Sequence, residues 1–160
     1  MDFTLSSSSL TPGQSVPNHF IFNGFGCQGD NISPALEWDG APSETKSFAV
    51  TVFDPDAPTD HGWWHWAVVN IPSSVNSLEE GASNNRTLPK EAIEVITDFN
   101  KTGYGGPCPP KGDKPHRYIF TVHALRKELD VKPNTNGISI EKKIEANSLA
   151  RASFTVQYGR

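Results

Sequence analysis

Apolar residues occur in this chain in short runs, which are separated by segments rich in glycine, proline, serine and asparagine. Three of the runs, at residues 47–53, 63–71 and 117–125, hold many β-branched and aromatic side chains and few charges. This composition is typical of strands buried within a sheet. Residues 153–158 alternate between polar and apolar side chains, which indicates a strand with one buried face.

Weaker patterns predict the remaining elements. Residues 139–150 form the one helix candidate, because Ser139 would cap its N-terminus while Ile140 and Ile144 share one face. The segment from 72 to 115 has little periodicity, and such long segments are usually functional or wrap the domain. Shorter extended or apolar pieces bounded by turn residues are expected at 3–5, 19–22, 36–38 and 92–96.

The sequence therefore predicts an all-β fold. We expect one domain over residues 1–160, built as a two-sheet antiparallel β-sandwich with one short late helix. The 160 residues, of which 36% are hydrophobic, are enough for one packed core. Thirteen prolines and thirteen glycines favour many turns between short strands over a helical bundle.

The charge balance argues against some partners. The formal net charge is −4 and no basic run stands out, whereas duplex binding needs a stripe of Lys and Arg. No nucleic-acid partner is therefore expected. No apolar stretch approaches the ~20 residues that span a bilayer, and residues 1–10 lack the pattern of a secretory signal. We expect a cytoplasmic protein without a transmembrane segment.

The two cysteines, Cys27 and Cys108, both lie in segments rich in glycine and proline. A disulfide would form if the two loops met, but cytosolic thiols are usually reduced. We therefore expect two partly buried free thiols. Because no Cys-x-x-Cys pair is present, a structural zinc site has little support.

An acidic segment rich in proline, residues 54–58, follows the first buried run directly. A residue before proline is pushed toward extended geometry, so Asp54 and Ala57 are expected to be extended. Asp54 and Asp56 would then project to the same side. The alternative is an ordinary turn with two solvated acids.

A histidine, His65, interrupts the second buried run between Trp64 and Trp66. Strand alternation predicts that His65 shares a face with Trp63 and that both flanking tryptophans face the other way. A buried imidazole needs a polar partner. His65 is therefore either a site residue or a core histidine bonded to a backbone carbonyl.

The third candidate segment runs from the Gly/Pro-rich loop 103–110 to the strand that begins near residue 116. Glycines let backbone amides approach a ligand, and prolines hold the loop without needing donors. His116 and Tyr118 face one way, while Arg117 and His123 face the other. A plain structural turn is the alternative interpretation of this loop.

Together the three segments predict an anion pocket at one edge of a sheet. Imidazolium and phenol groups would donate to phosphate or carboxylate oxygens. A carboxylate would orient a histidine and raise its pKa, or accept a ligand's ammonium group. Pro58, Trp63 and Pro109 would form apolar walls.

These motifs resemble the phosphatidylethanolamine-binding protein family, also called the Raf kinase inhibitor protein family, in its bacterial or archaeal branch. The matching segments are Asp54-Pro55-Asp56-Ala57-Pro58, Trp64-His65, Val68-Val69-Asn70, Gly106-Pro107-Cys108-Pro109-Pro110, Pro115-His116-Arg117-Tyr118 and Asn31-Ile32-Ser33-Pro34-Ala35-Leu36-Glu37-Trp38.

The resemblance implies a β-sandwich with a small pocket for phosphate or phosphorylated head groups. It also implies a cis peptide in the aspartate–proline loop, which we place at Ala57–Pro58. The acids and donors of the expected pocket are Asp54, Asp56, His65, His116 and Tyr118. Its expected walls are Pro58, Trp63, Gly106, Cys108, Pro109 and Pro110.

Our leading hypothesis is a binding protein for a small anionic or phosphorylated ligand, without enzymatic activity or cofactor, that regulates a kinase or another protein. Two histidines predict tighter anion binding as the pH falls through the imidazole range, ~6–7.

Several alternatives stay open. One is a hydrolase, with His65, His116 and Asp54 for acid–base catalysis and Cys108 as nucleophile. Another is a protease or kinase inhibitor that docks through its surface, and a homodimer is a further option. A third is a metal site, for which the suitable ligand types are Asp54, Asp56, His61, His65 and His116.

Overall fold

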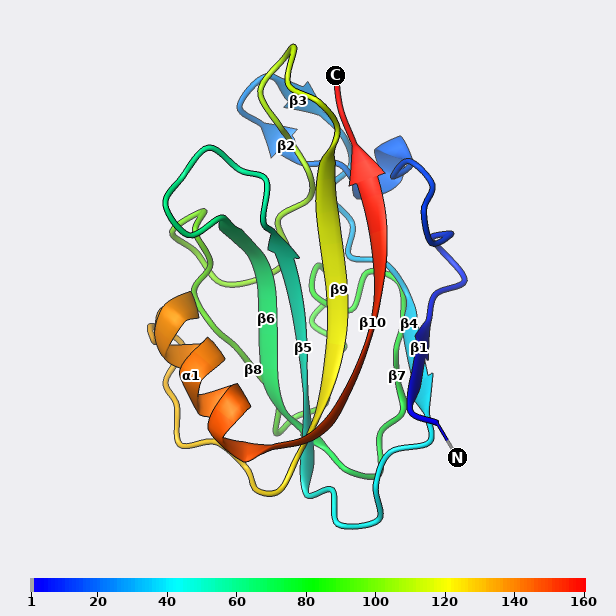
Figure 1. The fold of residues 1–160 in the computed structure, drawn as a ribbon, viewed down its shortest axis with the longest axis vertical. Helices are drawn as coiled ribbons and strands as arrows, with labels where there is room; N and C mark the ends of the chain where they lie inside the picture. Colours follow the sequence, from blue (N-terminus) through cyan, green and yellow to red (C-terminus); the bar gives the residue numbers. More distant parts are fainter. Residues whose placement is uncertain (1) are drawn as a thin grey trace.

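Two antiparallel sheets pack against each other in the computed structural model, which describes residues 2–160 (Figure 1). The larger sheet has the order β10-β9-β5-β6-β8 and the smaller one the order β1-β4-β7. The strands of the larger sheet are β5 (Ser47–Asp54), β6 (Trp63–Pro72), β8 (Ile93–Glu94), β9 (His116–Leu125) and β10 (Ser148–Tyr158). Those of the smaller sheet are β1 (Thr4–Ser6), β4 (Leu36–Asp39) and β7 (Ser77–Leu78). The predicted all-β fold is confirmed.

The alternation along β5 explains how both faces of the larger sheet are covered. Phe48 and Val50 point into the sandwich, where Phe48 packs edge-on against Trp38 of the smaller sheet at 5.4 Å between ring centroids. Ala49 points to the outer face and belongs to a second apolar cluster with Ile140 of the helix. A strand buried on both faces needs apolar residues at nearly every position, which is the pattern of 47–53.

The helix α1 (Gly137–Asn147) lies on the outer face of the larger sheet, as Figure 1 shows. It begins earlier than predicted, because Asn136 rather than Ser139 is the capping residue. The Asn136 side chain accepts a hydrogen bond from the backbone N–H of Ser139 at 2.9 Å. Asparagine and serine cap helices about equally well, so composition alone did not decide between them. No helix of residues 2–160 is long and apolar enough to cross a membrane.

The segment 19–22, predicted as extended, instead contains a short 3-10 helix at Asn18–Phe20, so the prediction is wrong there. The chain then enters a small hairpin of β2 (Asn23–Gly24) and β3 (Cys27–Gln28). The backbone N–H of Phe22 donates to the carbonyl of Pro107 at 3.1 Å, which places the hairpin beside the Gly/Pro-rich loop.

A disulfide joins Cys27 of the hairpin to Cys108 of that loop, with 6.0 Å between the two Cα atoms. The expectation of two free thiols is therefore wrong. The loops meet because Gly106 has no side chain: a Cβ there would lie 2.1 Å from the carbonyl oxygen of Phe20. Sequence spacing gives no sign of this contact, since 81 positions separate the cysteines.

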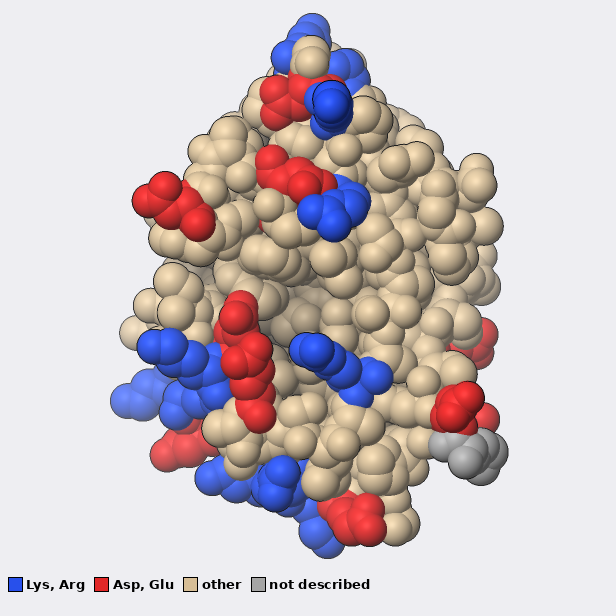
Figure 2. Space-filling view, viewed as in Figure 1, with Lys and Arg blue, Asp and Glu red and all other residues tan. Residues whose placement is uncertain are grey.

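Acidic and basic side chains are interspersed on the face with α1, and no continuous basic patch covers it (Figure 2). The absence of such a patch on this face agrees with the low basic content of the sequence.

Replacing both Cys27 and Cys108 by Ser should lower the free energy of unfolding by roughly 4 kcal/mol. The bridge spans 81 positions, and a cross-link that closes a long loop restricts the unfolded chain strongly. Chemical denaturation with and without a reducing agent measures this. The reducing agent should destabilise the wild type and leave the double variant unchanged; equal stability of all samples would contradict the prediction.

Candidate functional site

A bulge in β6 directs His65 toward the site. Consecutive residues of β5 pair with Trp64 and Trp66, which leaves His65 as the extra residue. Trp64 lies against Gly137 of α1 on the outer face, whereas Trp66 belongs to the sandwich core. His65 meets the ring of Tyr118, a member of the same core, at 5.2 Å between centroids. Trp64 faces the side of the sheet opposite to His65, as predicted. For Trp66 the prediction is wrong, because the bulge interrupts the alternation of side chains along the strand.

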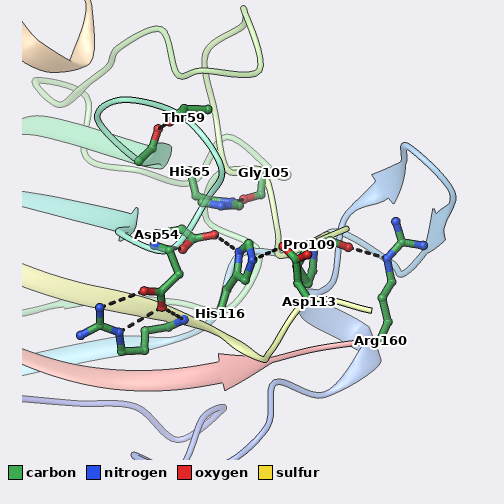
Figure 3. A network of polar contacts seen from close by, with 11 residues as sticks. Asp54, Thr59, His65, Gly105, Pro109, Asp113, His116 and Arg160 are labelled. Atoms are coloured by element: carbon green, nitrogen blue, oxygen red, sulfur yellow. Dashed lines mark hydrogen bonds and ion pairs between the residues drawn. The ribbon is translucent and has the colours of Figure 1, made fainter. Parts of the chain in front are cut away.

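The ring of His65 is held by the backbone of the Gly/Pro-rich loop. Its Nδ1 lies 2.7 Å from the carbonyl oxygen of Gly105 (Figure 3). A carbonyl only accepts hydrogen bonds, so Nδ1 carries the proton and Nε2 has a free lone pair in the neutral ring. No hydrogen-bond partner of Nε2 is found among residues 2–160. Burial lowers the pKa of His65 to about 4, which makes the ring neutral at pH 7.

Tyr118 places a phenol beside this histidine. Only 1% of the residue is exposed, and its hydroxyl has no hydrogen-bond partner within the described chain. Burial raises the pKa of Tyr118, with a further rise from the negative charge of Asp54, so the phenol stays protonated. Tyr104, the other buried tyrosine, donates instead to the carbonyl of Phe20 at 2.8 Å. The Tyr118 hydroxyl is therefore a buried donor without an acceptor.

The end of β5 and the start of β9 bring Asp54 and His116 together. Asp54 Oδ2 lies 2.7 Å from His116 Nδ1, and both side chains are at most 4% exposed. Burial raises the pKa of Asp54, although the hydrogen bond from His116 opposes the rise. Burial opposes a charge on His116 as well, but its bonds to Asp113 and Asp54 outweigh this and raise its pKa. The histidine is therefore held as an imidazolium between two carboxylates.

Asp56 turns away from this pair. The other carboxylate oxygen of Asp54 accepts from the backbone N–H of Asp56 at 2.7 Å, which bends the chain into a turn at Pro55. Asp56 then accepts three hydrogen bonds from Arg117, from its backbone N–H at 2.8 Å, Nε at 3.0 Å and Nη2 at 2.9 Å. The prediction that Asp54 and Asp56 project to the same side is wrong, because this turn replaces extended geometry.

A cavity of about 200 Å³ opens between these residues. Nine of the predicted residues line it: Asp54, Pro58, Trp63, His65, Cys108, Pro109, Pro110, His116 and Tyr118. Asp56 and Gly106 do not line it. The backbone N–H of Gly106 donates instead to the side chain of Asn31 at 2.7 Å, which fixes the loop behind the cavity.

Four lining residues were missed by the sequence reasoning: Phe25, Ala57, Thr59 and Phe99. Phe99 lies in the aperiodic segment, which carries no signal for it. Phe25 is 69% exposed and stacks on Phe99 at 6.0 Å between centroids. Phe25 lies in the hairpin that the Cys27–Cys108 bridge joins to the Gly/Pro-rich loop, and because sequence spacing offers no sign of that bridge, it offers none for Phe25 either.

Two further observations concern the cis peptide and the metal ligands that the sequence suggested. No cis peptide occurs in residues 2–160, so the cis bond expected at Ala57–Pro58 is wrong; the trans isomer is the more stable one by default. In the same described range, no three His, Cys, Asp or Glu residues are placed to hold a metal ion. His61, one of the suggested metal ligands, is exposed and does not line the cavity.

The comparisons with known proteins cover almost the whole chain. The family model described as phosphatidylethanolamine-binding protein matches residues 6–159. The UPF0098 proteins YbcL and YbhB of Escherichia coli K12 are 47% and 49% identical over 159 and 156 residues. These alignments cover 98% and 96% of this chain and 87% and 98% of the relatives.

Solved structures agree. The crystal structure of E. coli YbcL, described as a new member of the mammalian PEBP family, has a TM-score of 0.97 and 45% identity, covering 100% of this chain and 99% of its own. A putative homolog from Chlamydia trachomatis has a TM-score of 0.83 and 30% identity, with 99% and 97% covered. With its sequence matched from residue 6 to residue 159, the chain belongs to the phosphatidylethanolamine-binding protein family.

Proposed function

We propose that the cavity binds phosphate or the phosphorylated head group of a small molecule, without chemical conversion. The observation that supports the proposal is the hydroxyl of Tyr118, a residue that lines the cavity: this hydroxyl is buried and has no acceptor among residues 2–160. A buried unsatisfied polar group costs about 1–3 kcal/mol. A ligand oxygen at this position would remove that cost, so the site favours a ligand that brings acceptors.

His65 would supply the second donor. Its Nδ1–H stays on Gly105, and its Nε2 becomes a donor when the ring takes up a proton. Burial disfavours that proton, whereas a ligand anion beside the ring would favour it. Anion binding would thus take up a proton, and the aromatic and proline walls would exclude the water that screens this attraction.

A binding role is favoured over hydrolysis by the state of two side chains. Cys108, the candidate nucleophile, is in the disulfide and carries no thiol. Both ring nitrogens of His116 are engaged by carboxylates, which leaves neither free to accept a proton from water. We further propose that the occupied pocket regulates a kinase or another protein. Assembly as a homodimer stays a prediction.

We also propose that the domain works in an oxidising compartment and not in the cytoplasm, because disulfides persist in oxidising environments and are rare in the cytosol. Protein isolated from its native cells under an alkylating agent should have the intact mass of the oxidised, unmodified chain. Addition of two alkyl groups would contradict this and restore the cytoplasmic expectation.

Tyr118→Phe should weaken phosphate binding roughly ten- to a hundredfold while leaving the fold as stable as before or slightly more stable. The substitution removes a donor that only a ligand uses, and loss of a good hydrogen bond to a charged group corresponds to about 1.5–3 kcal/mol. Calorimetric titration with phosphate and thermal unfolding measure the two effects. Tyr104→Phe is the matched control: it should cost stability, since Tyr104 bonds Phe20, and leave binding nearly unchanged.

The affinity for sulfate should rise as the pH falls from 7 to 5, approaching tenfold per pH unit when binding takes up one proton. Sulfate stays a dianion over this range, so the slope reports the protein alone. The increase should continue below the ordinary imidazole range, because the pKa of His65 is about 4. His65→Asn keeps a donor toward Gly105 and should flatten the slope; an equal slope in both proteins would exclude His65 as the proton acceptor.

A further inference from the structure

His116 has no ring nitrogen left for a ligand. Nδ1 bonds Asp54 Oδ2 at 2.7 Å, and Nε2 bonds Asp113 Oδ2 at 2.9 Å. Figure 3 shows the two carboxylates on opposite sides of the ring. An imidazolium has only these two N–H groups, so a ligand oxygen that is to bind His116 has to replace one of the carboxylates.

The two carboxylates are not equally easy to replace. Asp54 is the last residue of β5, and its side chain is 3% exposed. It also accepts a hydrogen bond from the backbone N–H of Asp56. The Asp113 side chain is 40% exposed, and its bond to His116 is the one polar contact found for it within the described chain. If Asp54 moved away from His116, its buried carboxylate would lose its charged partner, which is costly. If Asp113 moved away, water could take the place of His116 as its hydrogen-bond partner.

Release of Asp113 requires only a rotation of its side chain. The backbone around it is anchored: Gly112 N–H donates to the carbonyl of Arg160 at 3.0 Å, and Arg160 Nε donates to the carbonyl of Pro109 at 2.6 Å. The loop therefore keeps its shape, and Pro109 stays in the cavity wall, while the Asp113 carboxylate rotates away from His116. A side-chain rotation of an exposed residue is fast and costs little.

The charges around His116 make this exchange a competition. The charged groups that act on it are Asp54 from β5, Asp113 from the loop before β9, and Asp56, whose charge is paired with that of Arg117. The ring of His65 from β6 also lies near it and is neutral at pH 7. One imidazolium between two carboxylates leaves the cluster net negative. An arriving anion is therefore repelled until Asp113 has moved away.

We infer that Asp113 is an internal competitor that occupies the Nε2 edge of His116, and that a phosphorylated ligand displaces it to be held by both histidines. This inference rests on the proposed anion binding and names a specificity residue for it. Asp113 sets the threshold for occupancy: weak or dilute anions leave it in place, and only a ligand that gains more from His116 than Asp113 does enters the full site.

The test is Asp113→Asn, with Asp113→Ala as a second variant and Asp60→Asn as the control. Asp60 is an exposed acid in the loop before β6 without a side-chain partner in the described chain, so its substitution makes the same change in net charge. Sulfate affinity is measured by calorimetry at pH 6 for all four proteins. The ring signals of His116 are followed by NMR against pH without ligand.

Both Asp113 variants should bind sulfate five- to tenfold more tightly than wild type, and Asp60→Asn should change the affinity less than twofold. The His116 pKa should fall in the Asp113 variants, since one of its two carboxylates is lost. If the wild type binds sulfate and the Asp113 variants bind it no more tightly than Asp60→Asn does, the inference is overturned and the proposed function stands. If all four proteins are folded and none of them binds sulfate or phosphate, the proposed function is overturned together with the inference.

Discussion

The buried hydrogen bond between Asp54 and His116 is the constraint on which the rest of the site depends. Two charged groups out of water are costly unless each finds a partner, and here the partners come from adjacent strands, β5 and β9. Their meeting fixes the edge of the sheet where the cavity forms. It also turns Tyr118, two residues further along β9, toward His65 of β6. This ion pair therefore helps to place two donors of the site, His116 and Tyr118, on the same face of β9.

The opposite wall of the cavity depends on a second constraint, the close approach of two loops. Gly106 lies against the backbone at Phe20 where no side chain would fit, and the Cys27–Cys108 bridge closes this contact covalently. Together they hold Pro109, Pro110 and Phe25 in the lining of the cavity. The sheet positions the polar groups, and the loops supply the apolar surface that keeps water from them.

Sequence patterns were sufficient for the long strands of the larger sheet and for most lining residues, because these depend on local alternation and on short motifs. They failed where the outcome depends on contacts between distant segments. The bulge at His65 arises from pairing with β5, the turn at Pro55 from the carboxylate of Asp54, and the disulfide from loops 81 positions apart. Asp113 was overlooked because an acid in an exposed loop looks solvated until His116 is seen beside it.

The donors of the site thus belong to two classes with different consequences for binding. Within residues 2–160 the Tyr118 hydroxyl and Nε2 of His65 have no hydrogen-bond partner, so the proposed ligand would gain from them without breaking any contact of the protein. The nitrogens of His116 are satisfied, so the proposed anion would gain from them only the difference between its own bond and that of Asp113. Under the proposed function, affinity would therefore come mainly from Tyr118 and His65, while His116 and Asp113 would decide how strong an anion has to be before it is fully held.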